Sequence, residues 1–298
     1  MVEASVPMRF SSVLVVAGAL ALAQGAFAQA FATNHISGNP DDSDSLIVFD
    51  PSSPGGYATV GSMGVPNIGF SGLDFDGDGN LWAYASFYKS TGGAASGLYS
   101  VDPSTGQATP VGQSFQSLQD LAYNPVDGKM YGINTQQAAF TRLYEVDLTT
   151  GATTQVGMLS GLPEQHYIQG LGIDSQGNFF LHDVANDVIF QGDGASFTSM
   201  YELDIVTVSS QGLTVDWSRD DAGYHAIVGQ GEFPNYVSAV NTFAVDGSGY
   251  FEGDAFGPND AGGFPPVQAG DIAIMPIPAP GGAAVVALAG AVMLRRRR

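Results

Sequence analysis

Hydrophobic and polar residues alternate in short runs along most of this chain, and the runs stop at glycine, proline, asparagine or aspartate. Leu98-Tyr-Ser-Val101 and Leu143-Tyr-Glu-Val146 are two such runs. Alternation of this kind is typical of β-strands, and the residues between the runs favour tight turns. Between residues 31 and 275 no long segment repeats its apolar positions at the helical period. The pattern therefore predicts an all-β domain.

One hairpin motif occurs three times. The segment from Leu98 to Gly112 reads LYSVDPSTGQATPVG, and the segment from Leu143 to Gly157, 45 residues later, reads LYEVDLTTGATTQVG. A more divergent copy runs from Leu46 to Gly61. Each copy is an alternating strand, an Asp-x-x-Thr-Gly type of turn and a second strand, which is the residue chemistry of a β-hairpin.

A second hairpin alternates with the first and opens on a residue followed by leucine. Two hairpins in a unit of roughly 45 residues match the four strands of a β-propeller blade. Residues 31–61 and a last strand at 271–275 complete one blade, so strands from both ends of the domain close the ring. The other blades are expected at residues 72–112, 120–157, 170–208 and 212–253. We favour five blades, and six is the alternative if residues 229–268 contain further strands.

These motifs resemble those of the lactonase/NHL-like and quinoprotein-like propeller families. The resemblance covers about residues 31–275. It rests on the LYxVDxxTG motif and on DxxGN turns such as residues 174–178. Turn chemistry alone produces both patterns. The resemblance therefore implies a propeller fold and leaves the activity open.

The N-terminal residues form an export signal. Arg9 precedes an apolar run of 11 residues, Val13–Ala23, and small residues follow with an A-x-A site at Ala26–Ala28. This order predicts a secretory signal peptide over residues 1–30, with the Sec translocon and signal peptidase as partners. Cleavage after Ala28 and cleavage after Ala30 both fit the pattern. Translation starts at Met1 or Met8.

The pattern of the C-terminal residues 276–298 predicts a sorting signal with three parts: prolines, an apolar run and a terminal arginine cluster. The run Gly281–Leu294 has 14 residues, about 21 Å as a helix, which is short for a bilayer core of roughly 30 Å. It would anchor a protein transiently, with the arginines on the cytoplasmic side. An ordinary short C-terminal transmembrane helix is the alternative. The residues that carry this signal are Pro278, Ala279, Pro280, Arg295, Arg296, Arg297 and Arg298.

This tail resembles the PEP-CTERM sorting signal of Gram-negative bacteria. The resemblance implies processing by an exosortase-type enzyme, followed by location at the cell surface or outside the cell, near exopolysaccharide. The family usually has Pro-Glu-Pro, whereas this chain has Pro278-Ala279-Pro280. That departure leaves cleavage and the processing enzyme open.

The domain between the predicted signal peptide and the C-terminal sorting signal is strongly acidic. Without Glu3, Arg9 and the four terminal arginines, the chain has 28 acidic and four basic residues, a net charge of −24. Such a surface repels nucleic acid and anionic lipid, which excludes both as partners. The chain has no cysteine, so disulfides and thiolate metal sites are excluded as well.

Candidate ligand-binding residues lie in the longer b–c and d–a connections, where strands are lettered a to d from the axis outward. Aromatic faces beside amides and carboxylates suit a sugar-binding surface, since binding residues of rigid scaffolds often lie in loops. Solvated loops with incidental aromatic residues are the alternative. The candidates are Tyr88, Asn134, His166, Tyr167, His182, Asp183 and Tyr236.

No cofactor is expected, and Ca²⁺ is the alternative. Asp74, Asp76, Asp78 and Asn80 form a D-x-D-x-D-G-N run, yet an EF-hand loop that starts at Asp74 requires Glu where Ala85 stands. A polar hairpin turn explains the run better. Scattered structural histidines are likewise favoured over a zinc site, because no H-x-x-x-H spacing occurs.

The sequence favours a non-enzymatic, exported propeller that binds or organises extracellular polymer such as polysaccharide or biofilm matrix. The alternative is a lactonase-like hydrolase with a divalent metal over the channel. Among the openings of the expected channel strands, only Asp74, Asp120 and Asp271 are carboxylates, which are few for a metal centre.

Overall fold

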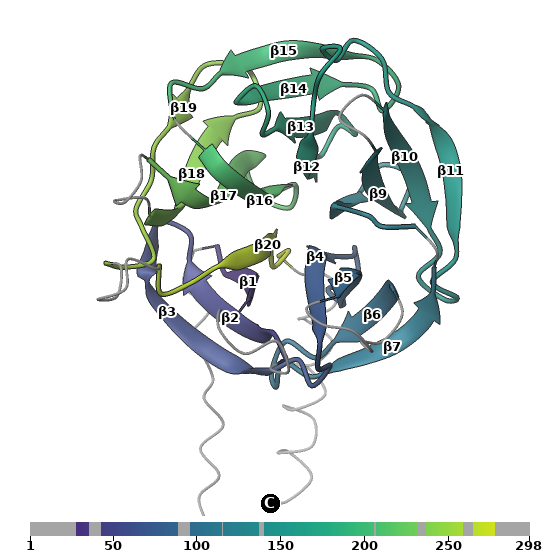
Figure 1. Ribbon diagram of the computed structural model, residues 1–298, viewed down its shortest axis with the longest axis vertical. Helices are drawn as coiled ribbons and strands as arrows, with labels where there is room; N and C mark the ends of the chain where they lie inside the picture. Colours follow the sequence, from purple (N-terminus) through teal and green to yellow (C-terminus); the bar gives the residue numbers. More distant parts are fainter. Residues whose placement is uncertain are drawn as a thin grey trace, which may run out of the picture.

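The protein is a five-bladed β-propeller, as the sequence predicts (Figure 1). The computed structural model describes residues 28–35, 43–88, 96–114, 116–136, 140–205, 207–231, 237–258 and 265–277. Five four-stranded antiparallel sheets surround one axis, and these residues form no helix that would cross a membrane. The predicted signal peptide through residue 27 and the tail residues 278–298 lie outside the described residues.

Each blade is a four-stranded meander whose first strand is innermost. Blade 1 consists of β20 (Ala269–Ile274), β1 (Ala30–Asn34), β2 (Ser45–Asp50) and β3 (Ser53–Ser62). Blade 2 consists of β4 (Ile68–Phe75), β5 (Leu81–Tyr88), β6 (Gly97–Val101) and β7 (Ala108–Gln113). Blade 3 consists of β8 (Asp120–Asn124), β9 (Lys129–Gln136), β10 (Phe140–Val146) and β11 (Thr153–Met158). Blade 4 consists of β12 (Ile168–Ile173), β13 (Phe179–Asp183), β14 (Val188–Gly192) and β15 (Phe197–Glu202). Blade 5 consists of β16 (Thr207–Val215), β17 (Ala222–Gln230), β18 (Val237–Ala244) and β19 (Tyr250–Phe251).

The ring closes as the sequence predicts, through a strand from the C-terminal part of the domain. β20 pairs with β1 in antiparallel register, from Ala30 opposite Ile274 to Thr33 opposite Asp271. In Figure 1 this strand, yellow, lies beside the purple β1. Closure in this way leaves no open seam between the first and last blades.

The meander gives the ring two different ends. The a–b and c–d connections, such as residues 76–80 and 102–107, lie at one end, which we call the turn end. The b–c and d–a connections lie at the other end, which we call the loop end. Both ends of the described chain leave from the turn end, where Met275 N–H donates to the Gln29 carbonyl at 2.9 Å.

The core is divided among the five interfaces between neighbouring blades. The leucine that opens each hairpin repeat packs towards the next blade. The residue that follows this leucine packs towards the preceding blade. In blade 2, Leu98 packs with residues of blade 3, whereas Tyr99 packs with residues of blade 1. Both side chains are almost fully buried. Successive strand residues point to opposite sheet faces, so the Leu-Tyr pair of the repeat serves two interfaces at once.

The Asp-x-x-Thr-Gly turn also joins neighbouring blades at the rim. The turn glycines Gly106 and Gly151 have φ values of 81° and 71°, which favour glycine. The Val-Gly ending of the preceding blade packs against this turn: a Cβ on Gly112 would lie 1.9 Å from the Thr150 carbonyl oxygen. Gly157 ends the third copy of the motif, and a Cβ there would meet nothing within 4 Å.

We expect Gly112→Ala to lower the free energy of unfolding by about 1–3 kcal/mol, because its methyl group overlaps blade 3 backbone. Gly157→Ala is the matched control, since it makes the same change at the same place in the repeat, and we expect an effect within about 0.5 kcal/mol. Equilibrium unfolding in urea measures both. Equal losses in the two variants would contradict the packing described here.

Candidate functional site

The five innermost strands share one position at the centre of the ring. It is occupied by Gly72, Asp120, Gly170, Gly212 and Asp271, and each of these residues precedes a leucine or isoleucine. A Cβ on Gly212 would lie 2.1 Å from Asp271 Oδ1. Two carboxyl groups therefore occupy the centre. Gly212 leaves room for Asp271, while Gly72 and Gly170 leave room for Leu121 and Leu213 of the following blades.

Backbone N–H groups from all five blades donate to these two carboxyl groups. Asp271 accepts from Leu73 N at 2.5 Å and from Ile272 N at 2.7 Å. Asp120 accepts from Leu121 N and Leu171 N, each at 2.6 Å, and from Leu213 N at 3.3 Å. The donors follow the shared position in every blade, so the strands meet in one hydrogen-bonded cluster.

Asp120 and Asp271 also hydrogen-bond to each other, and both are completely buried. Burial raises the pKa of Asp120 to about 8. Burial, followed by the nearby charge of Asp120, raises the pKa of Asp271 well above its usual value. Two carboxylates this close do not both ionise at neutral pH, so the pair holds a shared proton.

This centre has the chemistry of an anion cage. Backbone N–H groups stabilise negative charge, and a cation would have to compete with them for the same oxygens. Within the described ranges no three histidine or acidic side chains are grouped for metal binding. The arrangement joins the blades and leaves the carboxyl groups without access to solvent.

The residues of the calcium alternative lie in and beside one hairpin turn. Asp74 is buried and accepts from Tyr123 N of blade 3 at 2.7 Å, and burial raises its pKa to about 7. Asp76 accepts from Asp78 N, from the backbone and side chain of Asn80, and from the Trp82 indole. Calcium binding here stays a prediction, and an ion would have to displace these donors.

A second polar pair lies near the centre, at the loop end. His35 Nδ1 is 2.8 Å from Asp44 Oδ2, which also accepts from Phe70 N at 3.0 Å. The histidine ring packs over Gly270, where a Cβ would lie 2.2 Å from Nε2. Asp44 thereby orients His35 and ties blade 1 to blade 2.

A buried histidine pair joins blades 4 and 5. The rings of His182 and His225 are 4.1 Å apart between centroids, and both side chains are completely buried. His225 Nδ1 is 3.0 Å from the Tyr250 hydroxyl. Neither nitrogen of His182 has a hydrogen-bond partner among the described residues. Burial lowers the pKa of His182 to about 3 and that of His225 well below its usual value, so both rings are neutral near pH 7.

The predicted ligand-binding residues do not form one exposed cluster in the described part of the ring. The prediction that these residues lie in connections is wrong for Asn134, which is in β9, and for His182 and Asp183, which end β13. These three residues and His166 are buried, whereas Tyr167 is 36% exposed. His166 contacts the Pro163 carbonyl and the Thr141 hydroxyl. The Tyr88 side chain and all of Tyr236 lie outside the description. Ligand binding by these residues therefore stays a prediction, with Tyr167 the exposed member.

Tyr167 is held firmly despite its exposure. Its N–H donates to Asp183 Oδ1 at 2.8 Å, and its carbonyl accepts from Val184 N at 3.0 Å. Asp183 also accepts from Ala185 N and from the Asn186 amide. The predicted pair of Tyr167 and Asp183 is thus in direct contact, with the carboxylate fixing the backbone that presents the ring.

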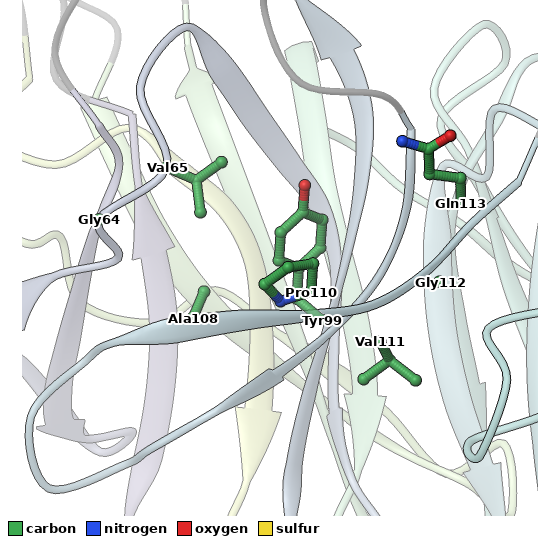
Figure 2. A pocket seen from close by; sticks show the side chains of 8 residues that line it. All are labelled: Gly64, Val65, Tyr99, Ala108, Pro110, Val111, Gly112 and Gln113. Atoms are coloured by element: carbon green, nitrogen blue, oxygen red, sulfur yellow. The ribbon is translucent and has the colours of Figure 1, made fainter.

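A hollow of about 470 Å³ lies at the rim of blade 2. Figure 2 shows Val65, Tyr99 and Pro110 gathered on one side of it and Gln113 at the other. Its lining is largely apolar, and none of the residues predicted to bind a ligand lines it.

Sequence reasoning missed both polar pairs and the histidine contact. His35 and Asp44 are nine residues apart, but His182 and His225 belong to different repeats. The sequence does carry one signal for the centre: Asp120 and Asp271 stand where the other blades have glycine.

Comparisons with known proteins agree on the fold and go no further. Residues 26–122, about a third of the chain, match a family model described as DUF4394, a domain of unknown function. No curated protein matches. Among solved structures, a chain in the crystal structure of a nidogen/laminin complex is 13% identical, with a TM-score of 0.50, over 83% of this chain and 98% of that one. TolB from Acinetobacter baumannii is 16% identical, with a TM-score of 0.45, over 78% of this chain and 53% of that one. At 13% identity, the likeness to the chain of the nidogen/laminin complex concerns the fold alone.

The central pair predicts a pH dependence of stability. The pKa of Asp120 is about 8 in the folded state and about 3.8 in the unfolded chain. Its contribution to stability is therefore complete below about pH 3.8 and is lost as pH rises to about 8. The free energy of unfolding of the wild type therefore decreases as pH rises through this window. We expect the decrease to be less steep in Asp120→Asn, by about 1.4 kcal/mol per pH unit.

Urea unfolding of the wild type and Asp120→Asn at several values between pH 5 and 8 measures the difference. Asp78→Asn is the control, because Asp78 is an exposed carboxylate of the neighbouring hairpin. Parallel stability profiles for the wild type and Asp120→Asn would show that no shared proton holds the centre.

Proposed function

We propose that this protein is an exported, surface-sorted, non-enzymatic propeller that binds or organises extracellular polysaccharide. The observation that carries the proposal is the position of the described chain ends. Met275 pairs with Gln29, and Ile277 N–H donates to the Ser218 hydroxyl at 3.0 Å, both at the turn end. A tail that anchors the protein from residue 278 onwards presents the loop end outwards.

The chemistry of the centre favours binding over hydrolysis. A propeller hydrolase with a metal over its channel requires carboxylates that are free to coordinate and open to substrate. Asp120, Asp271 and Asp74 accept backbone N–H groups and are buried. The same contacts make the ring a rigid support for the connections at its loop end.

Tyr167 is the anchor we assign to the ligand. Its ring is exposed at the loop end, and Asp183 fixes its backbone, so little conformational entropy is lost on binding. Tyr88 is the last residue of β5, at the same end, and Tyr236 directly precedes β18 in the sequence. An aromatic face packs against the apolar face of a sugar ring, and neighbouring amides and carboxylates bind its hydroxyls.

The charge of the domain narrows the ligand class. With a net charge of −24, the domain repels a polyanion unless cations bridge the two. We therefore propose a neutral or amine-bearing polysaccharide. An acidic polymer would bind only with added Ca²⁺, which is why the ion belongs in the test.

The test measures binding of the purified protein to neutral, amine-bearing and acidic polysaccharides, with and without Ca²⁺. We expect saturable binding to the first two classes, and Tyr167→Ala should weaken it at least about fivefold, as truncation of an aromatic anchor does. Trp217→Ala is the aromatic control, since Trp217 lies at the turn end against Tyr123. Absence of binding to every polymer, or equal losses in the two variants, would contradict the proposal.

Sorting is tested separately, by mass spectrometry of the mature protein from its native host. We expect an N-terminus at Gln29, because cleavage after Ala28 keeps the residue that pairs with Met275. We expect a C-terminus upstream of Gly281, because the proposed enzyme cleaves at the proline motif. Recovery of Arg298 on the processed surface protein would show that the tail is a retained membrane segment. The control variant replaces Arg295–Arg298 with glutamine, which removes the cytoplasmic signal and leaves the ring unchanged.

A further inference from the structure

The outer edge of blade 3 is unlike the outer edges of the other blades. The outermost strand of a propeller blade has unpaired backbone groups on one side, and such edges are usually protected by proline, charge, short length or a covering segment. In Figure 1 these strands form the rim of the ring. Their protection can therefore be compared blade by blade.

Four of the five outer strands carry recognisable protection. β7 contains Pro110 at an exposed position, β15 ends on the exposed Glu202, and β19 has only two residues. β3 is covered in part, because its Tyr57 packs against Phe256 at 6.1 Å between ring centroids. β11 reads TTQVGM and contains neither proline nor charge.

The Val-Gly ending of β11 is also uncovered. In blades 1 and 2 the equivalent glycines, Gly61 and Gly112, pack against the turn of the next blade. A Cβ on Gly157 would meet nothing within 4 Å. Val156 is 55% exposed, whereas the equivalent Val60 and Val111 are half-buried.

Three exposed apolar side chains lie at this edge. Phe140 and Met158 lie on the sheet face towards blade 2. Val156, like its equivalents Val60 and Val111, lies on the face towards the next blade. Val156 and Met158 are two residues apart on β11, and Met158 is 57% exposed. Phe140 on β10 is 47% exposed, two residues before Arg142, which pairs with Met158. A diagonal neighbour in a sheet is about 7–8 Å away, so Phe140 and Met158 belong to one apolar patch.

Blade 3 carries basic residues that offset part of the repulsion towards a second copy, and β11 itself is uncharged. Of the four basic residues between 31 and 275, Lys129 and Arg142 lie on blade 3, and Lys129 pairs with Glu145 at 2.7 Å. A neutral strand meets an antiparallel copy of itself without like charges face to face.

We propose that two copies of this chain associate through the outer edge of blade 3, with Phe140, Val156 and Met158 packed across a twofold axis. A twofold axis brings the same surface of both copies together, and antiparallel strands are related by such an axis. A β-bulge at Val156 interrupts the ladder, so the contact rests mainly on the apolar side chains. The patch is small, and we expect a dissociation constant in the micromolar range or weaker, about 10⁻⁶ to 10⁻³ M.

Sedimentation velocity of the purified protein tests this association over a concentration series. Val156→Lys should raise the dissociation constant at least tenfold, because it buries a charge at the contact. Val126→Lys is matched in residue, blade and charge, and Val126 is 63% exposed in a turn at the other end of the blade. An added positive charge lowers the general repulsion between these acidic domains, so a non-specific effect would strengthen association in both variants.

Cross-linking locates the contact independently. The chain has no cysteine, so Gln155→Cys places a lone thiol on β11, and Ser199→Cys places one at the equivalent exposed position of β15. We expect a disulfide-linked dimer from Gln155→Cys and little from Ser199→Cys. Equal cross-linking of both variants, a monomer at all concentrations, or equal behaviour of Val156→Lys and Val126→Lys would overturn the proposal. No polysaccharide is present in these experiments, so their outcome is independent of the ligand test.

Discussion

The hydrogen-bonded carboxyl pair at the centre is the interaction on which the rest of the ring depends. Asp120 and Asp271 accept backbone N–H groups from strands of all five blades. The chain has no disulfide to hold the blades together. Two negative charges on these neighbouring buried carboxyl groups would repel each other strongly, and the shared proton removes one of the charges. The centre is stable because the charge that remains is surrounded by N–H donors.

This constraint explains the distribution of glycine on the inner strands. Gly212 must be glycine because Asp271 occupies the space of its side chain. Gly72 and Gly170 instead leave room for Leu121 and Leu213 of the following blades, from which a Cβ would lie 2.8 Å away. The rim uses glycine in another way, since the Val-Gly endings fit onto turns of the next blade. The Val-Gly ending of blade 3 lacks that cover, because this rim meets the turn of blade 4 further along the chain, at Ser160 and Gly161. Blade 3 is the blade where we place the contact with a second copy.

The fold could be predicted from the sequence because its signals are local. The Asp-x-x-Thr-Gly turn fixes a hairpin by itself, and Leu98 with Tyr99 encodes the two faces of a blade within two residues. The count of five followed from the spacing of these hairpins and from the single strand left over at 271–275. None of these inferences required a contact between distant residues.

The candidate site could be predicted only in part, because its contacts join distant repeats. Asp120 and Asp271 are 151 residues apart, and their meeting depends on how five inner strands converge. The burial of Asn134, His166 and His182 was missed for a similar reason. Asn134 donates to the Ser117 carbonyl, His166 contacts Thr141 of blade 3, and His182 packs on His225 of blade 5. None of these contacts can be read from the local sequence. Tyr167, at the surface of a connection, is the residue for which local reasoning and the structure agree most closely.

The closure of the ring has a mechanical consequence. The first strand of the ring in sequence, β1, begins at Ala30, and the last strand, β20, ends at Ile274. These two residues lie opposite each other in the β1–β20 pair. A force that pulls the two chain ends apart would open this pair one hydrogen bond at a time, from Ala30 and Ile274 inwards. A force between the C-terminal segment and a ligand held at the loop end runs along β20 and loads its hydrogen bonds in parallel. The same strand pair is therefore weak to peeling and strong to the load that a surface-anchored polymer binder would experience.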